Sequence, residues 1–165
     1  MNDRDIATLA AELGRRLAAL GTLVATAESC TGGLVAGAIT EIAGSSGWFD
    51  RGFITYSNAA KMEMLGVALH TLESHGAVSE ETARAMAEGA IRASRANLAV
   101  AVTGIAGPAG GTAAKPVGSV CFAWAARNGP TTAASHQFNG DREAVRRASV
   151  IVALQGLIDR IGKAQ

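Results

Sequence analysis

Residues 22–43 of the chain read TLVATAESCTGGLVAGAITEIA. The first six residues form a short apolar run, which is typical of a buried strand. Residues 31–43 carry their apolar side chains at helical spacing, and Gly44 follows as a breaker. The polar residues around Ser29 are therefore predicted to form a strand-to-helix turn, the arrangement found in α/β sheets.

The same alternation of helix and strand continues along the chain. Further helices are predicted over residues 6–20, 58–64, 79–95 and 141–161, and further strands over residues 49–56, 98–102, 117–126 and 133–138. This order predicts an α/β fold, a three-layer α/β/α sandwich with a mixed, mostly parallel sheet of about five strands. A short connection joins the last two strands, so this pair is expected to be antiparallel. No repeat or composition shift suggests a second domain within residues 1–165.

Composition narrows the class of protein. Of the 165 residues 48% are hydrophobic and 18% charged, and the formal net charge is +1, which argues against broad binding of nucleic acid or anionic membrane. No apolar run approaches the roughly 20 residues of a membrane span, and the start of the chain does not resemble a signal peptide. Two distant cysteines, Cys30 and Cys121, are expected to be reduced thiols in a cytoplasmic protein.

Ser29 is the main candidate for a nucleophile. Ligands of parallel sheets bind beyond the carboxyl ends of the strands, where the turn containing Ser29 is predicted. Gly32 and Gly33 begin the next helix, and their N–H groups are candidates for stabilising an oxyanion. The alternative from these residues alone is that Ser29 and Thr31 only cap the helix.

Lys61 is the candidate base, and it is one of only three lysines in the chain. A catalytic lysine must be neutral near pH 7, which requires desolvation or a nearby positive charge. Apolar neighbours make partial burial possible, although a solvated lysine on a short helix is the alternative. Tyr56, the only tyrosine, is expected either to orient Lys61 or the substrate, or to rest its ring in the core with its hydroxyl in water.

Other reactive groups compete with this assignment. Ser46 is the main rival nucleophile, whereas Cys30 is expected to be a buried structural thiol because no histidine lies near it in sequence. The glycine-rich segment 103–108 follows a predicted strand and is expected to share the pocket with Ser29. In the last helix, an arginine such as Arg142 or Arg146 is a candidate for contacting a substrate phosphate. The three histidines form no recognisable metal pattern.

Taken together in their order, the motifs resemble the CinA C-terminal domain family. The residues that carry the resemblance are 27–33 (AESCTGG), 42–46 (IAGSS), 52–58 (GFITYSN) with Lys61, 76–79 (GAVS), 103–108 (TGIAGP), 115–118 (KPVG) and 140–142 (GDR). They span nearly the whole chain. The resemblance implies a three-layer α/β/α domain over residues 1–165.

The resemblance also implies an activity. Stand-alone members of the family are bacterial nicotinamide-nucleotide amidases, which convert nicotinamide mononucleotide to nicotinic acid mononucleotide and ammonia and so recycle pyridine nucleotide toward NAD. They are understood to use a Ser/Lys dyad, which corresponds to Ser29 and Lys61 here. No metal or other cofactor is expected. The alternative is a non-catalytic module that binds a nucleotide or a partner, linked to competence or DNA damage.

The resulting site prediction has two parts. Ser29, Lys61 and Tyr56 are predicted to be catalytic. The predicted substrate-binding residues are Glu28, Thr31, Gly32, Gly33, Ser46, Thr103, Gly104, Ala106, Gly107 and Arg142. The predicted partner is the small-molecule substrate, and binding of nucleic acid or membrane is not expected. The chain is expected to form a homodimer, because small α/β enzymes often associate symmetrically.

Overall fold

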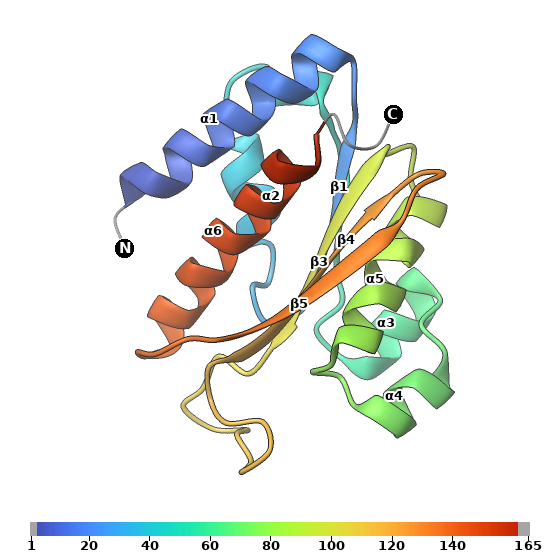
Figure 1. Ribbon diagram of the computed structural model, residues 1–165, viewed down its shortest axis with the longest axis vertical. Helices are drawn as coiled ribbons and strands as arrows, with labels where there is room; N and C mark the ends of the chain where they lie inside the picture. The colour runs from blue at the N-terminus through green and yellow to red at the C-terminus, as the bar shows by residue number, and fades with distance from the viewer. Residues whose placement is uncertain (1–2, 162–165) are drawn as a thin grey trace.

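A computed structural model describes residues 3–161, with a five-stranded sheet at its centre (Figure 1). The strands are β1 (Val24–Glu28), β2 (Phe49–Ile54), β3 (Leu98–Gly104), β4 (Ser119–Ala126) and β5 (Thr131–Gln137). They are arranged in the order β2-β1-β3-β4-β5. β1 pairs in parallel with β2 and β3, whereas β4 is antiparallel to both β3 and β5. All strands of this sheet except β4 therefore point the same way, which confirms a mixed, mostly parallel sheet.

Helices cover both faces of the sheet (Figure 1). One face carries α1 (Asp3–Leu20), α2 (Leu34–Thr40) and α6 (Arg142–Arg160), and the other carries α3 (Asn58–Leu65), α4 (Leu69–His75) and α5 (Glu80–Arg92). A single 3-10 turn, η1 (Ser45–Gly47), precedes β2. The predicted three-layer α/β/α sandwich is thus confirmed. In the described part of the chain no helix is long and apolar enough to cross a membrane.

Two local predictions differ from the structure. The helix predicted over residues 31–43 is shorter, because Gly32 and Gly33 have φ values of 56° and 101° and so cannot belong to a right-handed helix. They lengthen the turn after Ser29 instead. The helix α4 was not predicted, since Leu72 is its one buried residue and leaves no apolar stripe to detect.

The core on the α5 face is built largely from alanine, which brings the helices close to the sheet. Ala99 and Ala101 of β3 pack there against Ala87 and Met86 of α5. At Gly89 an added Cβ would collide with the carbonyl oxygen of Leu65, at the end of α3. Small residues therefore let α5 approach the sheet and α3 approach α5, and this fixes the position of α3 beside the strands.

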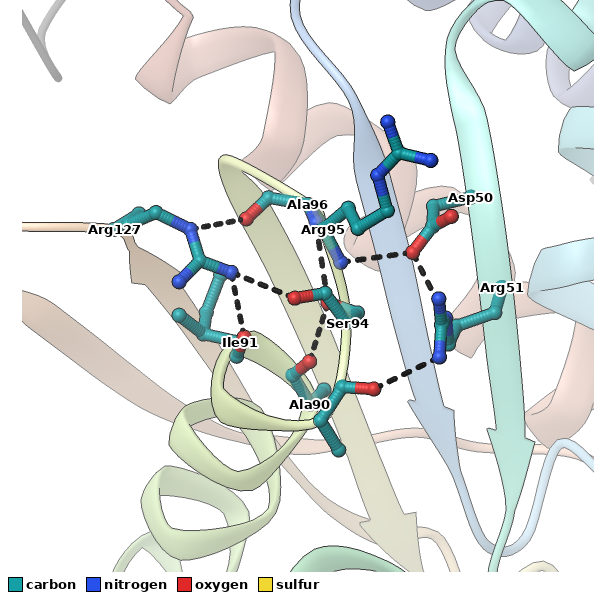
Figure 2. A network of polar contacts seen from close by, with 9 residues as sticks. Asp50, Arg51, Ala90, Ile91, Ser94, Arg95, Ala96 and Arg127 are labelled. Atoms are coloured by element: carbon teal, nitrogen blue, oxygen red, sulfur yellow. Dashed lines mark hydrogen bonds and ion pairs between the residues drawn. The ribbon is translucent and has the colours of Figure 1, made fainter.

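A polar network closes the sheet at its amino edge, where the parallel strands β1, β2 and β3 begin (Figure 2). The guanidinium of Arg127 donates to backbone carbonyls at the end of α5 and just beyond it, those of Ile91, Ser94 and Ala96. Asp50 accepts from the backbone N–H of Arg95 at 2.9 Å and from Arg51 at 2.8 Å. These contacts satisfy the final carbonyls of α5 and tie that helix to β2 and β4.

Candidate active site

The opposite edge of the sheet gathers the predicted site residues. Ser29 directly follows β1, Thr55 follows β2, and Gly104 ends β3. Hydrogen bonds continue the strand pairing into this region, from Ser29 N to Val102 O at 2.9 Å and from Thr55 N to Glu28 O at 2.7 Å. The three carboxyl ends therefore lie side by side, as expected for neighbouring parallel strands.

Ser29 and Lys61 meet in the interior of this edge. The Nζ atom of Lys61 lies 3.1 Å from the Ser29 Oγ and donates to the carbonyl oxygen of Thr55 at 3.0 Å. The relative exposure is 1% for Lys61 and 8% for Ser29. Lys61 lies in the first turns of α3, which begins at the side-chain cap of Ser57, and side chains of a helix point toward its amino end. The position of Lys61 near the start of α3 thus directs its amine toward Ser29.

Burial governs the protonation of this amine. Desolvation lowers the pKa of Lys61 below its ordinary value, because the charged form loses its hydration. Both polar contacts of Nζ are neutral oxygens, and among residues 3–161 no carboxylate forms an ion pair with Lys61. A neutral amine in this position can accept the proton of the serine hydroxyl.

Cys30, next to the serine, is a poor nucleophile. It is buried and unpaired by any disulfide, and burial raises the pKa of its thiol to about 12. The thiolate is the reactive form of cysteine, so at neutral pH this side chain stays a thiol. Cys121 is also a free, buried thiol, as expected for both cysteines.

Ser46 lies away from this pair. It is exposed in η1, just before β2 begins, and the adjacent carbonyl of Trp48 accepts a hydrogen bond from Val24 N at the start of β1. That is the amino edge of the sheet, opposite to the edge that carries Ser29 and Lys61. The structure therefore does not bring Ser46 together with the other predicted site residues.

Glu28 has a different role from the predicted contact with substrate. Its side chain is fully buried, and its two carboxylate oxygens accept hydrogen bonds from Val35 N at 2.9 Å and Ala36 N at 3.0 Å. A carboxylate at a helix start satisfies free N–H groups and interacts favourably with the helix dipole. Glu28 therefore caps α2, whereas neither Ser29 nor Thr31 supplies a side-chain cap.

The turn after Ser29 has both committed and free N–H groups. Gly32 N donates to Ser29 O at 3.0 Å, so the prediction that this amide is open to an oxyanion is wrong for this conformation. The N–H groups of Cys30, Thr31 and Gly33 donate to no other residue within the described part of the chain. Thr31 itself is fully buried, and its hydroxyl has no partner there either.

Tyr56 contacts Arg142 and not Lys61. Tyr56 is 62% exposed, and its hydroxyl oxygen accepts from Arg142 Nη2 at 3.0 Å. The other end of the same guanidinium donates to Gly107 O at 2.9 Å. Arg142 thus links the segment after β2 to the loop after β3, at the rim of the site.

Other residues of the predicted pocket are engaged in the fold. The hydroxyl of Thr103 donates to Ala77 O at 2.7 Å, and its side chain is buried. Gly104 pairs with Val120 of β4, and Ala106 is buried in the core. Of the predicted residues in the loop, Gly107 is the one that reaches Arg142. Within the described residues no three metal-binding side chains are grouped closely enough to hold an ion.

Arg146 is a site residue whose place the sequence did not reveal. It lies in the second turn of α6, and its guanidinium donates to Cys30 O at 3.2 Å and to Thr31 O at 3.3 Å. From the sequence it was only one of several arginines that could contact a phosphate. No local pattern signals its contact with the turn, because the two segments are more than 110 residues apart in the chain.

A separate cavity of about 650 Å³ opens between the start of α5 and the β4–β5 pair. Its polar side chains are largely paired with the protein: Ser135 donates to Glu80, and Lys115 donates to the carbonyl of His75. None of the predicted site residues lines it. The cavity is therefore not part of the Ser29 site.

The fold and the buried hydroxyl–amine pair define a three-layer α/β/α domain with a candidate serine–lysine site. Residues 6–161 match the family model described as the CinA C-terminal domain. The chain belongs to this family, which confirms the family resemblance of its motifs.

Individual relatives are similar over nearly their whole length. The nicotinamide-nucleotide amidohydrolase PncC of Enterobacter agglomerans is 56% identical over 155 residues, which cover 94% of this chain and 94% of that protein. The protein of the same name from Escherichia coli (strain K12) is 54% identical over 157 residues, 95% of either chain. The crystal structure of the competence/damage inducible protein CihA from Agrobacterium tumefaciens matches with a TM-score of 0.93 and 55% identity, over 94% of both chains.

The capping role of Glu28 can be tested by mutation. Glu28→Ala is expected to lower the free energy of unfolding by about 1.5–3 kcal/mol, because two backbone N–H groups lose a charged acceptor. Glu28→Gln keeps one acceptor oxygen and should recover part of the loss. Urea unfolding followed by circular dichroism measures both. Wild-type stability of Glu28→Ala together with a raised KM would instead assign Glu28 to substrate binding.

Burial of Lys61 also predicts a pH dependence of stability. The unfolded chain protonates Lys61 near the ordinary value of about 10.4, whereas the folded pKa is lower. Between these values the unfolded state binds more protons, so this residue makes the fold more stable as the pH rises through that window. Lys61→Met should therefore be more stable than wild type at pH 7, with the difference shrinking toward pH 10.5. A difference that is constant from pH 6 to pH 10 in urea unfolding would contradict the burial effect.

Proposed function

We propose that this protein is an amidohydrolase that converts nicotinamide mononucleotide to nicotinic acid mononucleotide and ammonia, with Ser29 as nucleophile and Lys61 as base. The observation that carries the proposal is the 3.1 Å contact between a buried lysine amine and a serine hydroxyl at the carboxyl edge of the sheet. The substrate is inferred from the relatives named nicotinamide-nucleotide amidohydrolase, which match 94% and 95% of this chain.

The proposed reaction has two half-steps. Neutral Lys61 removes the proton of Ser29 while the Oγ atom attacks the carboxamide carbon. When the tetrahedral intermediate collapses, the C–N bond breaks and Lys61 returns the proton to the departing ammonia. A water molecule, deprotonated by the same amine, then attacks the acyl-enzyme ester. As the C–Oγ bond breaks, protonated Lys61 returns the proton to the Ser29 oxygen, and the acid product leaves and loses its own proton to solvent.

Backbone amides of the turn are proposed to stabilise the oxyanion. Cys30 follows the nucleophile directly, and Gly33 is the N-cap of α2; the N–H groups of both donate to no other residue within residues 3–161. One well-placed donor contributes about 3 kcal/mol to transition-state stabilisation in comparable enzymes. The helix dipole of α2 adds little here, because the Glu28 carboxylate already neutralises that helix start.

The rim of the site is proposed to bind the ribose phosphate. Arg142 is exposed and held by Tyr56 and Gly107, and a guanidinium can bind a phosphate through two parallel hydrogen bonds. Tyr56 presents an exposed ring beside it, suited to contact the substrate. We further propose a cytoplasmic homodimer that acts in the recycling of pyridine nucleotide toward NAD, with neither nucleic acid nor a metal ion required.

Ammonia release from nicotinamide mononucleotide tests the proposal. The purified protein should release ammonia at the same rate with and without a chelator. Ser29→Ala and Lys61→Met should lower kcat by about 10⁴-fold or more, because the nucleophile and base act as a unit. Ser46→Ala, at the opposite edge of the sheet, is the matched control and should keep wild-type kcat.

Two outcomes would revise the proposal. Loss of activity in Ser46→Ala but not in Ser29→Ala would keep the reaction and move the nucleophile. Binding of the mononucleotide without ammonia release by the wild type would favour the non-catalytic binding module.

A further inference from the structure

Arg146 reaches the nucleophile turn from another layer of the sandwich. It lies one turn beyond the Asp141 cap of α6, and the neighbouring Val145 is fully buried in the core. The guanidinium spans two successive carbonyl oxygens, those of Cys30 and Thr31, at 3.2 and 3.3 Å. An added Cβ at Gly32 would come within 3.5 Å of the same guanidinium, so it lies directly against the turn.

These contacts fix successive peptide planes. In a trans peptide the C=O of one residue and the N–H of the next point in opposite directions within one plane. Gly32 N donates to the carbonyl of Ser29, and Arg146 donates to the carbonyls of Cys30 and Thr31. The Thr31 carbonyl also accepts from Leu34 N at 3.0 Å, whereas Arg146 is the one donor to the Cys30 carbonyl within the described residues. Arg146 thus sets the direction of the free Thr31 N–H through the Cys30 carbonyl, and it orients the Gly32 N–H, whose bond to Ser29 O in turn sets the direction of the Cys30 N–H. Hydrogen bonds from a charged donor are stronger than neutral ones, which suits this restraining task.

The same contacts leave the guanidinium little freedom to bind a ligand. Two of its N–H groups are engaged by the turn, and the side chain is half-buried. Arg142, four residues earlier, is exposed and lies at the rim instead. Arg142 and Arg146 thus occupy different environments, although each has a charged residue next to it in the sequence.

We propose that Arg146 is a positioning residue for amide hydrolysis, which holds the carbonyls of Cys30 and Thr31 so that Ser29 stays aligned with Lys61 and the turn amides face the oxyanion. It does not bind the substrate phosphate, a task left to Arg142. This inference rests on the proposed function, since it assigns Arg146 a part in that same reaction.

Kinetics of Arg146→Ala separate positioning from phosphate binding. Misplacement of reacting groups by about 1 Å can cost about 100-fold in rate. Arg146→Ala should therefore lower kcat by about 10- to 100-fold with KM for nicotinamide mononucleotide nearly unchanged, and Arg146→Lys should recover part of kcat. Arg142→Ala should show the reverse, a raised KM with kcat largely kept. A raised KM and unchanged kcat in Arg146→Ala would overturn the proposal.

A matched control excludes a general effect of losing an arginine. Arg51 also donates to a backbone carbonyl, that of Ala93 at 3.0 Å, but at the opposite edge of the sheet. Arg51→Ala should keep wild-type kcat and KM.

Calorimetric titration with nicotinic acid mononucleotide should give the same Kd for Arg146→Ala as for wild type. A Kd weakened tenfold or more would place Arg146 at the phosphate and overturn the proposal.

Labelling of Ser29 tests the inference without the substrate. A sulfonyl fluoride that reacts with activated serines should modify Ser29 in the wild type, detected by peptide mass spectrometry, and should react about 10-fold more slowly with Arg146→Ala. Slow labelling of Arg146→Ala would support the positioning role whether or not the wild type hydrolyses the mononucleotide. If the wild type released no ammonia from the mononucleotide, that result would refute the proposed function but not the positioning role. Equal labelling rates for folded Arg146→Ala and wild type would refute the positioning role.

Discussion

The site depends on keeping the amine of Lys61 out of water without giving it a carboxylate partner. An ion pair would favour the charged form, whereas burial beside the neutral oxygens of Ser29 and Thr55 favours the neutral one. The nearby carboxylate of Glu28 is occupied at the start of α2. The free energy of desolvating the amine must be offset elsewhere, and the closely packed alanine core around α5 is the part of the fold that holds α3 in place.

The two edges of the sheet have opposite characters. At the amino edge, Arg51 and Arg127 donate to carbonyls at and just beyond the end of α5, and Asp50 accepts from Arg95 N, so these charged side chains are engaged by the backbone (Figure 2). At the carboxyl edge, free N–H groups of the turn and the exposed Tyr56 remain available. This difference between the two edges follows the general rule that ligands of parallel sheets bind where the strands end. Ser46 precedes β2 and therefore lies at the amino edge, apart from Lys61.

The layer arrangement of the fold and the candidate nucleophile and base could be predicted from the sequence. The alternation of helix and strand gave the layers, and the motif order identified the family, which placed Ser29 and Lys61. The roles of Glu28 and Arg146 could not be predicted, because a carboxylate beside a serine fits substrate binding as well as capping, and a contact across more than 110 residues leaves no local pattern. Tyr56 was predicted as the last residue of its strand, whereas β2 ends at Ile54, and only the fold shows that the Tyr56 hydroxyl contacts Arg142.

Direct titration of Lys61 tests the central claim of a neutral, buried amine. The chain has only three lysines, so labelling the lysine ε-carbons with ¹³C gives a simple NMR spectrum, and Lys61→Met assigns the resonance. The account predicts that this resonance titrates clearly below the ordinary value of about 10.4. A Lys61 resonance that titrates at the ordinary value would show that the amine is charged at neutral pH, and it would contradict a base at Ser29.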